Sequence, residues 1–238
     1  MNGADSLTTP QRSTAPGDAA SAASCQEPSA VHGIMAVLGW VPRLVLLHLG
    51  WVVLVLAGGV VAGLAPATAT MLRILRRDPA AGAAGRLRGV LFMYRAEFLP
   101  ANRAAGPFML ISLMAGVNIA LGILGALPEW FFPAGFLAAL LFGAVSTLSS
   151  FHAVVIHVLA PDTPAPTVWT GALAGPFLLP VPTVSWVITL GAMVVTGAII
   201  QPVAWLLSGG IMIAVTGAVL ARPWQVRLDA ARAGSGSR

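Results

Sequence analysis

Residues 44–64 read LVLLHLGWVVLVLAGGVVAGL and contain no charged side chain. A helix of this length extends about 31 Å, which matches the hydrocarbon core of a bilayer at about 30 Å. The same composition continues through the chain of 238 residues, of which 57% are hydrophobic and only 9% are charged. Soluble domains carry about 25% charged residues. The sequence therefore predicts an integral membrane protein and excludes a soluble globular one.

Charged residues divide the sequence into four long apolar runs. A charged side chain at the centre of a bilayer costs roughly 2.5–3.5 kcal/mol, so we expect the membrane-spanning helices to lie between the charges. The runs contain 29, 25, 32 and 59 residues, at positions 44–72, 104–128, 130–161 and 163–221. Each of the first three has room for one helix of about 20 residues. The fourth would extend about 88 Å as one helix, so it must fold back.

The fourth run has its best turn at Gln201-Pro202, which leaves one span on each side. Residues 168–179 before these spans are too few to cross a bilayer, given the prolines around them, so they predict an interfacial or shallow re-entrant helix. The fold class is therefore an all-α, polytopic membrane helix bundle with additional cytoplasmic amphipathic helices. Its five predicted transmembrane helices lie at residues 44–64, 108–127, 134–159, 181–200 and 203–221.

The two ends of the chain differ in composition from the spans. Residues 1–30 are rich in Ser, Ala, Thr and Pro, and we expect them to form a disordered polar N-terminal tail. The transmembrane domain is expected at residues 31–222, and a cytoplasmic arm at residues 65–107 connects its first two spans. Residues 223–238 are expected to form a flexible cytoplasmic C-terminal tail.

The basic residues are thirteen arginines, and their distribution indicates the orientation of the protein. Seven lie within residues 73–103 and four lie after residue 221. With five spans both groups fall on the same side of the membrane, and the positive-inside rule puts that side in the cytoplasm. The N-terminus is then outside and the C-terminus is cytoplasmic. Because the arginines flank apolar runs and do not form a basic face on a soluble module, we expect no binding of nucleic acid.

The arm begins at a proline. Pro66 has no N–H and disfavours helical geometry at Ala65, so we expect the first span to end near Gly63. Thr68 is then in position to cap a short helix. The arginines of that helix share one face, which predicts a helix that lies on the inner leaflet with its guanidinium groups near lipid phosphates.

A second helical pattern follows in the arm. Four apolar or aromatic residues recur at helical spacing with a polar residue on the flank, namely Leu87, Leu91, Tyr94, Phe98 and Asn102. One interpretation is a surface helix that leads into the second span. The other is a docking face for a cytoplasmic or membrane partner.

Two elements of the arm resemble one known family. Gly-Leu-Ala-Pro-Ala-Thr-Ala-Thr at residues 63–70 is similar to the Gly-Pro-Ala-Thr-Ala element of the YesL family of bacterial integral membrane proteins. The Tyr94-x3-Phe98-x3-Asn102 pattern resembles that family's aromatic-aromatic-Asn pattern before its second span. The motif residues that the resemblance marks at the expected turn are Gly63, Pro66, Ala67 and Thr68.

The resemblance covers roughly residues 35–222 and has further implications. It implies five spans, a cytoplasmic first loop and a location in the bacterial plasma membrane, with the lipid bilayer around the protein. The family has no established biochemical activity. It is often associated with carbohydrate uptake, which implies membrane subunits of a carbohydrate importer as partners.

The predicted spans contain few side chains of the kinds that bind ions or catalyse reactions. No Asp, Glu, Lys or Arg lies within them, whereas coupled carriers place ionisable residues inside the bundle. His152 and His157 lie about 140° apart on a straight helix, so they do not suit one metal ion. We expect them instead to form hydrogen bonds between helices or to lie near the cytoplasmic interface. The sequence has no pairing of Cys with His, no paired carboxylates in a span and no phosphate loop. We therefore expect no cofactor, no metal and no enzymatic activity.

Two functional classes remain. The first is an accessory or structural membrane component, which the resemblance associates with carbohydrate uptake. The small number of polar residues in the spans and the amphipathic arm favour this class. The second is a stand-alone permease-like transporter of a small solute, whose path would use hydroxyl groups such as Ser149. An odd number of spans without an internal repeat disfavours the second class.

Overall fold

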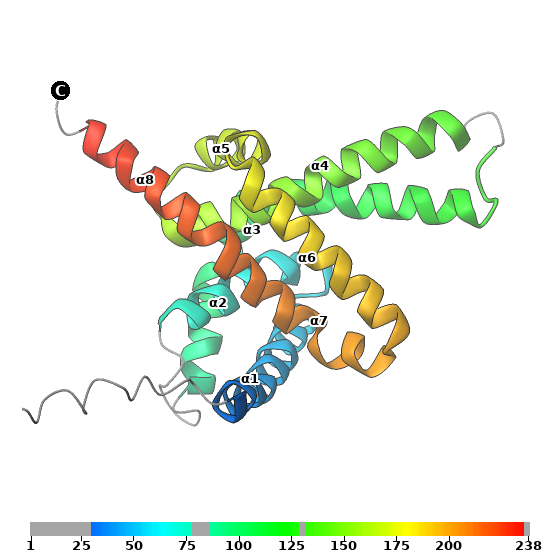
Figure 1. The fold of residues 1–238 in the computed structure, drawn as a ribbon. Helices are drawn as coiled ribbons and strands as arrows, with labels where there is room; N and C mark the ends of the chain where they lie inside the picture. Colours follow the sequence, from blue (N-terminus) through cyan, green and yellow to red (C-terminus); the bar gives the residue numbers. More distant parts are fainter. Residues whose placement is uncertain (1–29, 78–85, 129–131, 236–238) are drawn as a thin grey trace, which may run out of the picture. The chain divides into compact units, whose positions relative to one another are not determined.

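The computed structural model describes residues 30–77, 86–128 and 132–235. The chain divides into two compact units, Met1–Trp40 and Val41–Arg238. Within the described residues the structure is helical and contains no strand. The elements are α1 (Ala30–Ala57), α2 (Val61–Arg77), α3 (Arg86–Ile123), α4 (Phe132–Leu159), α5 (Ala165–Leu178), α6 (Pro180–Ile199), α7 (Gln201–Val215), the π-helical turn η1 (Thr216–Leu220) and α8 (Ala221–Ser235) (Figure 1).

Five of the described helical segments are long and apolar enough to cross a membrane, which confirms the predicted fold class. The expected N-terminal tail lies almost entirely outside the described residues. The segments are Gly39–Ala57, Leu87–Ile123, Pro133–Leu159, Pro180–Ile199 and Leu206–Gly234.

The first span ends earlier than the sequence suggests. α1 ends at Ala57, and the chain reverses through Gly58, Gly59 and Val60, the last two with φ of +78° and +56°. Glycine adopts positive φ without a steric penalty. A side chain at Gly58 would meet the Tyr94 hydroxyl, and the backbone of Val55 occupies the space beside Gly63. The two glycines therefore let α2 return closely along α1, and the expected end near Gly63 is corrected.

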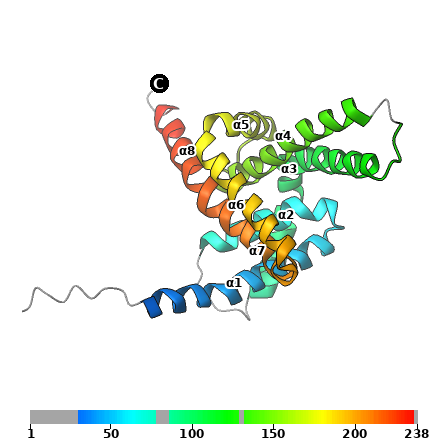
Figure 2. The same ribbon diagram turned by 45° about the vertical axis from the view of Figure 1, so that its right-hand side comes forward.

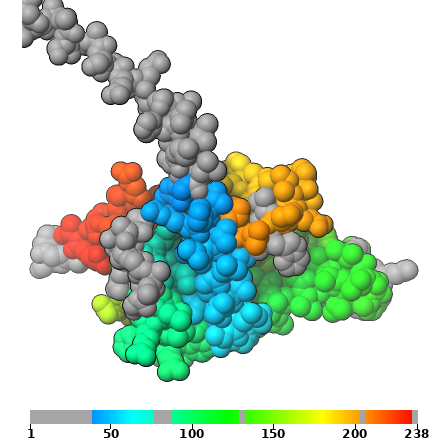
Figure 3. All heavy atoms as spheres, turned by 90° about the horizontal axis from the view of Figure 1, so that it is seen from below, coloured from blue at the N-terminus to red at the C-terminus, as the bar shows by residue number. Residues whose placement is uncertain are grey.

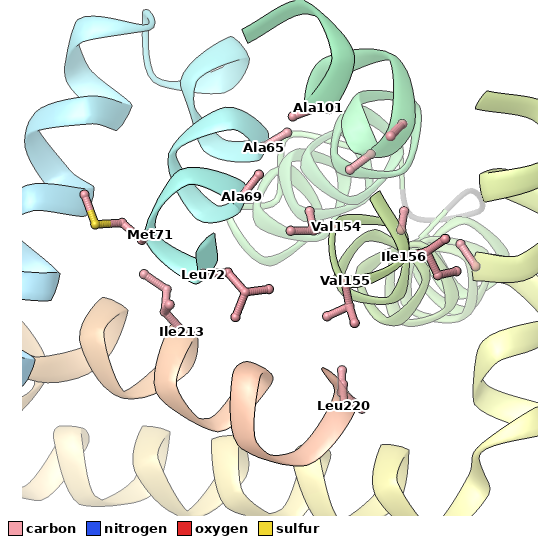
Figure 4. Packing of buried hydrophobic residues seen from close by; sticks show 14 of the residues in the cluster. Ala65, Ala69, Met71, Leu72, Ala101, Val154, Val155, Ile156, Ile213 and Leu220 are labelled. Carbon is pink, nitrogen blue, oxygen red and sulfur yellow. The ribbon is translucent and has the colours of Figure 1, made fainter. Parts of the chain in front are cut away.

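α2 is the centre of the bundle. All residues from 65 to 72 are buried, and α2 contacts α3, α4, α7 and η1. Figure 4 shows Ala65 beside Ala101 of α3, and Leu72 between α4 and the helix that carries Ile213 and Leu220. The sequence predicted a helix on the inner leaflet. Its alanines instead permit close approach of neighbouring helices, so the helix lies inside the protein.

α3 combines two elements that the sequence separates. The helical part of the cytoplasmic arm and the second span form one helix of 38 residues that continues through Pro100 and Pro107. α3 and α4 run side by side as an antiparallel pair (Figures 1 and 2). In Figure 3 the green atoms of the α3 and α4 pair are seen at the right. The pair has large exposed apolar side chains, including Met114 at 64% and Phe142 at 63%.

The last third of the chain has one short helix and two long ones. α5 has 14 residues, about 21 Å, and this is too short to cross the core of a bilayer. The chain turns at Ile200, beside the predicted Gln201-Pro202 turn. α7, η1 and α8 then follow one another without a break to Ser235. The flexible tail expected from residue 223 is therefore corrected to a helix, which Trp224 anchors by its burial in the core.

Candidate functional site

Asn102 and Pro66, which belong to the two motifs singled out in the sequence, meet at one carbonyl group. In a helix the N–H of residue 66 would bond to the carbonyl oxygen of Ala62, but Pro66 has no N–H. The side chain of Asn102 supplies the donor, with Nδ2 at 2.8 Å from the Ala62 oxygen and 2.8 Å from the Phe98 oxygen. The two motifs therefore join α2 to α3.

The remaining residues of the expected turn also lie inside α2. Thr68 does not cap a helix. Its hydroxyl donates to the carbonyl of Leu64 at 2.8 Å and accepts a hydrogen bond from the indole N–H of Trp51 at 3.1 Å. Ala67 is fully buried, and Gly63 packs on the backbone of Val55. The family-motif turn is thus corrected to a buried helical segment that binds α1 and α3.

The expected docking face is divided by the fold. Tyr94 is only 6% exposed, and its ring contacts Phe98 edge-on at a centroid distance of 5.8 Å. These two residues and Asn102 are turned towards other helices of the chain itself. Leu87 and Leu91 remain at the surface. The face is corrected to an internal contact along most of its length, because α2 folds back and covers it.

A charged cluster lies where α2, α3 and α4 meet. A guanidinium nitrogen of Arg73 is 3.1 Å from one carboxylate oxygen of Glu97, and Nε2 of His157 is 2.8 Å from the other. The side chains are 14%, 13% and 5% exposed, respectively. A carboxylate that bridges two helices in this way holds them in a fixed register. Breaking one contact would leave a charge that is poorly solvated.

Sequence reasoning missed this charged cluster. It assigned Arg73 to a lipid-facing surface and gave Glu97 no role. A signal was present, because Glu97 is the sole acidic residue between Asp78 and Glu129 in a segment that is rich in arginine. An isolated carboxylate in such a segment favours an internal ion pair. Its partners could not be identified without knowing that α2 folds back.

His152, the other histidine of α4, is part of a chain of hydrogen bonds between helices. The indole N–H of Trp224 donates to Nδ1 of His152 at 2.8 Å, and Nε2 of His152 lies 3.1 Å from the hydroxyl of Thr183. Because indole is only a donor, Nδ1 accepts, and the proton of the neutral ring resides on Nε2. Thr183 in turn donates to the carbonyl of Leu179 at 2.7 Å. The predicted interhelical hydrogen bonding of the histidines is confirmed.

One other helical proline follows the rule seen at Pro66. Pro107 leaves the Arg103 carbonyl without its helical donor, and the indole N–H of Trp169 bonds to that oxygen at 3.0 Å. The carbonyl of Leu178, at the end of α5, also lacks a helical donor and accepts a hydrogen bond from Arg227 at 2.7 Å. Each of these carbonyls therefore binds a side chain from another helix.

A shallow apolar groove of about 580 Å³ lies between α3 and α4. Small side chains form most of its lining, and Phe142 is its one aromatic residue. Asn118 contributes an amide, and within the described part of the chain this amide has no hydrogen-bond partner. The lining residues are Ile111, Met114, Ala115, Asn118, Ala134, Gly135, Ala138, Ala139 and Phe142.

Among the described residues, no group of three His, Cys, Asp or Glu side chains is arranged to hold a metal ion. Residues 44–119 match the model of a family described as a protein of unknown function, DUF624. The matched residues include α2 and Asn102. The match supports a relationship to an uncharacterised family of membrane proteins. No curated protein and no solved structure matches the chain.

Proposed function

We propose that the protein is a non-enzymatic accessory or structural component of a bacterial plasma membrane, and that it docks a transmembrane helix of a partner in the groove between α3 and α4. The observation that carries the proposal is the combination of small lining residues with the amide of Asn118, which has no hydrogen-bond partner among the residues that the structure describes. Small residues let helix backbones approach closely within a bilayer, and amide side chains form hydrogen bonds between helices there.

The internal contacts of the protein support the same proposal. Buried charged and polar side chains of the bundle bind one another across helices, as at Glu97 and His152. Such contacts stabilise one arrangement of the bundle, which suits a scaffold. By contrast, the groove side of α3 and α4 presents apolar side chains and an amide that a partner helix can engage.

A membrane subunit of a carbohydrate importer is the partner that we propose. This choice rests on the resemblance of residues 63–70 and of the Tyr94 to Asn102 pattern to the YesL family. We propose an external N-terminus and a cytoplasmic C-terminus from the distribution of the arginines.

A stand-alone permease is the second candidate, and one observation favours it. The hydroxyl of Ser149 is buried and has no hydrogen-bond partner in the described residues. A solute path could use such a group. In an accessory protein the Ser149 hydroxyl would have no function other than packing between helices.

The experiment is purification of the tagged protein from its native membrane in mild detergent, followed by mass spectrometry of the proteins that remain bound. We expect stoichiometric importer subunits with the native chain. Ala138→Leu fills the groove from an exposed position, and Asn118→Leu removes the amide, so both should release the partner. Gly116→Leu is the matched control, because Gly116 lies outside the groove with open space beside it.

If the native chain purifies without a partner, or if Ala138→Leu retains the same partner as the control, docking in the groove is wrong. Solute flux in liposomes that contain only this protein, reduced by Ser149→Ala, would then establish the permease.

A further inference from the structure

A second hollow lies where the C-terminal ends of α2 and α4 meet the interior of α8. It has a volume of about 150 Å³ and lies beside α2, α4 and α8. α8 packs on α4 at this end of the molecule (Figure 1). The residues that line it are Arg76, Val158, Leu159, Gln225, Leu228, Asp229 and Arg232.

Two guanidinium groups reach this hollow from different helices. Arg76 donates to the side-chain oxygen of Gln225 at 3.0 Å, and Arg232 pairs with Asp229 at 3.3 Å. Each contact orients one arginine. With two guanidinium groups and one carboxylate, the lining carries a net charge of +1. Guanidinium groups bind phosphate through paired hydrogen bonds, and arginine is well suited to this purpose.

The hollow also has an apolar wall, formed by Val158, Leu159 and Leu228. Leu159 is the last residue of the apolar α4 segment that can cross a membrane. The end of such a segment lies near the level of the lipid head groups. Basic pockets between helices at this depth on the cytoplasmic side are suited to phosphorylated head groups.

We propose that this hollow binds a phosphate ester between Arg76 and Arg232. The phosphate group belongs either to an anionic phospholipid or to a small soluble molecule, since both present the same oxygens. The apolar wall contacts the glycerol and upper acyl carbons in the first case. Asp229 opposes the bound anion and limits the affinity, while it holds Arg232 in place.

The test measures phosphate binding to the full-length protein in detergent. Native mass spectrometry counts retained phosphatidylglycerol and retained phosphatidylcholine, and a second arm measures displacement of the anionic lipid by inorganic phosphate. We expect Arg76→Gln and Arg232→Gln each to weaken phosphatidylglycerol binding about tenfold, because each removes a charged hydrogen-bond donor. Asp229→Asn should strengthen it, because it removes a repelling charge.

Arg222→Gln is the matched control. Arg222 is an exposed arginine of α8 outside the lining of the hollow, so the variant has the same loss of net charge. Selective loss in Arg76→Gln and Arg232→Gln, without displacement by inorganic phosphate, identifies a lipid site. The same loss with displacement by inorganic phosphate identifies a site for soluble phosphates. Equal binding by all four variants, or equal loss in the control, overturns the proposal.

Discussion

The side chain of Asn102 replaces the hydrogen-bond donor that Pro66 lacks. Its Nδ2 lies 2.8 Å from the Ala62 carbonyl oxygen, which is the acceptor that the N–H of residue 66 would use in an uninterrupted helix. The same nitrogen donates to the Phe98 carbonyl of its own helix at 2.8 Å. One amide therefore completes α2 and connects it to α3. A proline in the central helix is tolerated because α3 provides this group.

Asn102→Ala should lower the stability of the native chain by about 1 kcal/mol, because it leaves the Ala62 carbonyl unpaired. In a Pro66→Ala background the helix regains its own N–H, so the same substitution should cost much less. Thermal unfolding of all four proteins in one detergent measures the coupling. Identical losses in both backgrounds would show that Asn102 acts independently of Pro66.

Glu97→Gln should destabilise the protein by about 3 kcal/mol, because it leaves the charge of Arg73 partly buried and unpaired. Combining it with Arg73→Met should restore part of that loss, since neither charge is then left alone. Asp229→Asn serves as the control. The side chains of Arg232 and Asp229 are 62% and 59% exposed, and an exposed ion pair contributes about 0–1 kcal/mol. The prediction is contradicted if the double variant loses the sum of the two single losses.

Trp224→Phe should loosen α8 and lower stability by about 1–3 kcal/mol, because Nδ1 of His152 loses the indole donor while most of the ring packing is kept. Hydrogen exchange is the measurement, and we expect faster exchange in residues 221–235 than elsewhere. Trp169→Phe is the comparison, since its indole donates at an exposed position on another helix. Unchanged exchange in α8 would mean that apolar packing alone fixes this helix.

Gly63→Ala should strongly destabilise the protein, because the added Cβ would overlap the backbone of Val55, and backbone atoms cannot rotate away as a side chain can. We expect a loss of several kcal/mol, visible as aggregation or as a large fall in the unfolding temperature. Gly116→Ala adds the same methyl group where space is open and should leave stability nearly unchanged. Equal behaviour of the two variants would contradict close packing of α1 on α2.

Length and charge were sufficient to predict the helical class, the five apolar segments and the turn beside Gln201. Each of these depends on the cost of placing charges and unpaired backbone groups in a bilayer, and that cost can be read along the sequence. The interhelical role of His152 was also predictable, because a histidine in an apolar helix needs a partner. These properties are local or nearly so.

The site around α2 could not be predicted in the same way. Pro66 usually indicates the end of a helix, and only the carboxamide of Asn102, 36 positions later, accounts for its place inside one. The arginines of α2 similarly indicate a membrane surface until Glu97 is placed beside Arg73. In both cases a contact between distant residues reverses a local preference. Local spacing contains no information about such a contact.

The central position of α2 also has a consequence for biogenesis. Leu72 packs against residues of α4 and of the helix that carries Ile213 and Leu220, and the ribosome synthesises all of these later than α2. α2 has 17 residues and ends in two arginines, so it is poorly suited to stable insertion by itself. Its final environment must therefore assemble after most of the chain has been translated. Premature termination before residue 213 would leave the middle of the protein open to lipid or to quality-control proteases.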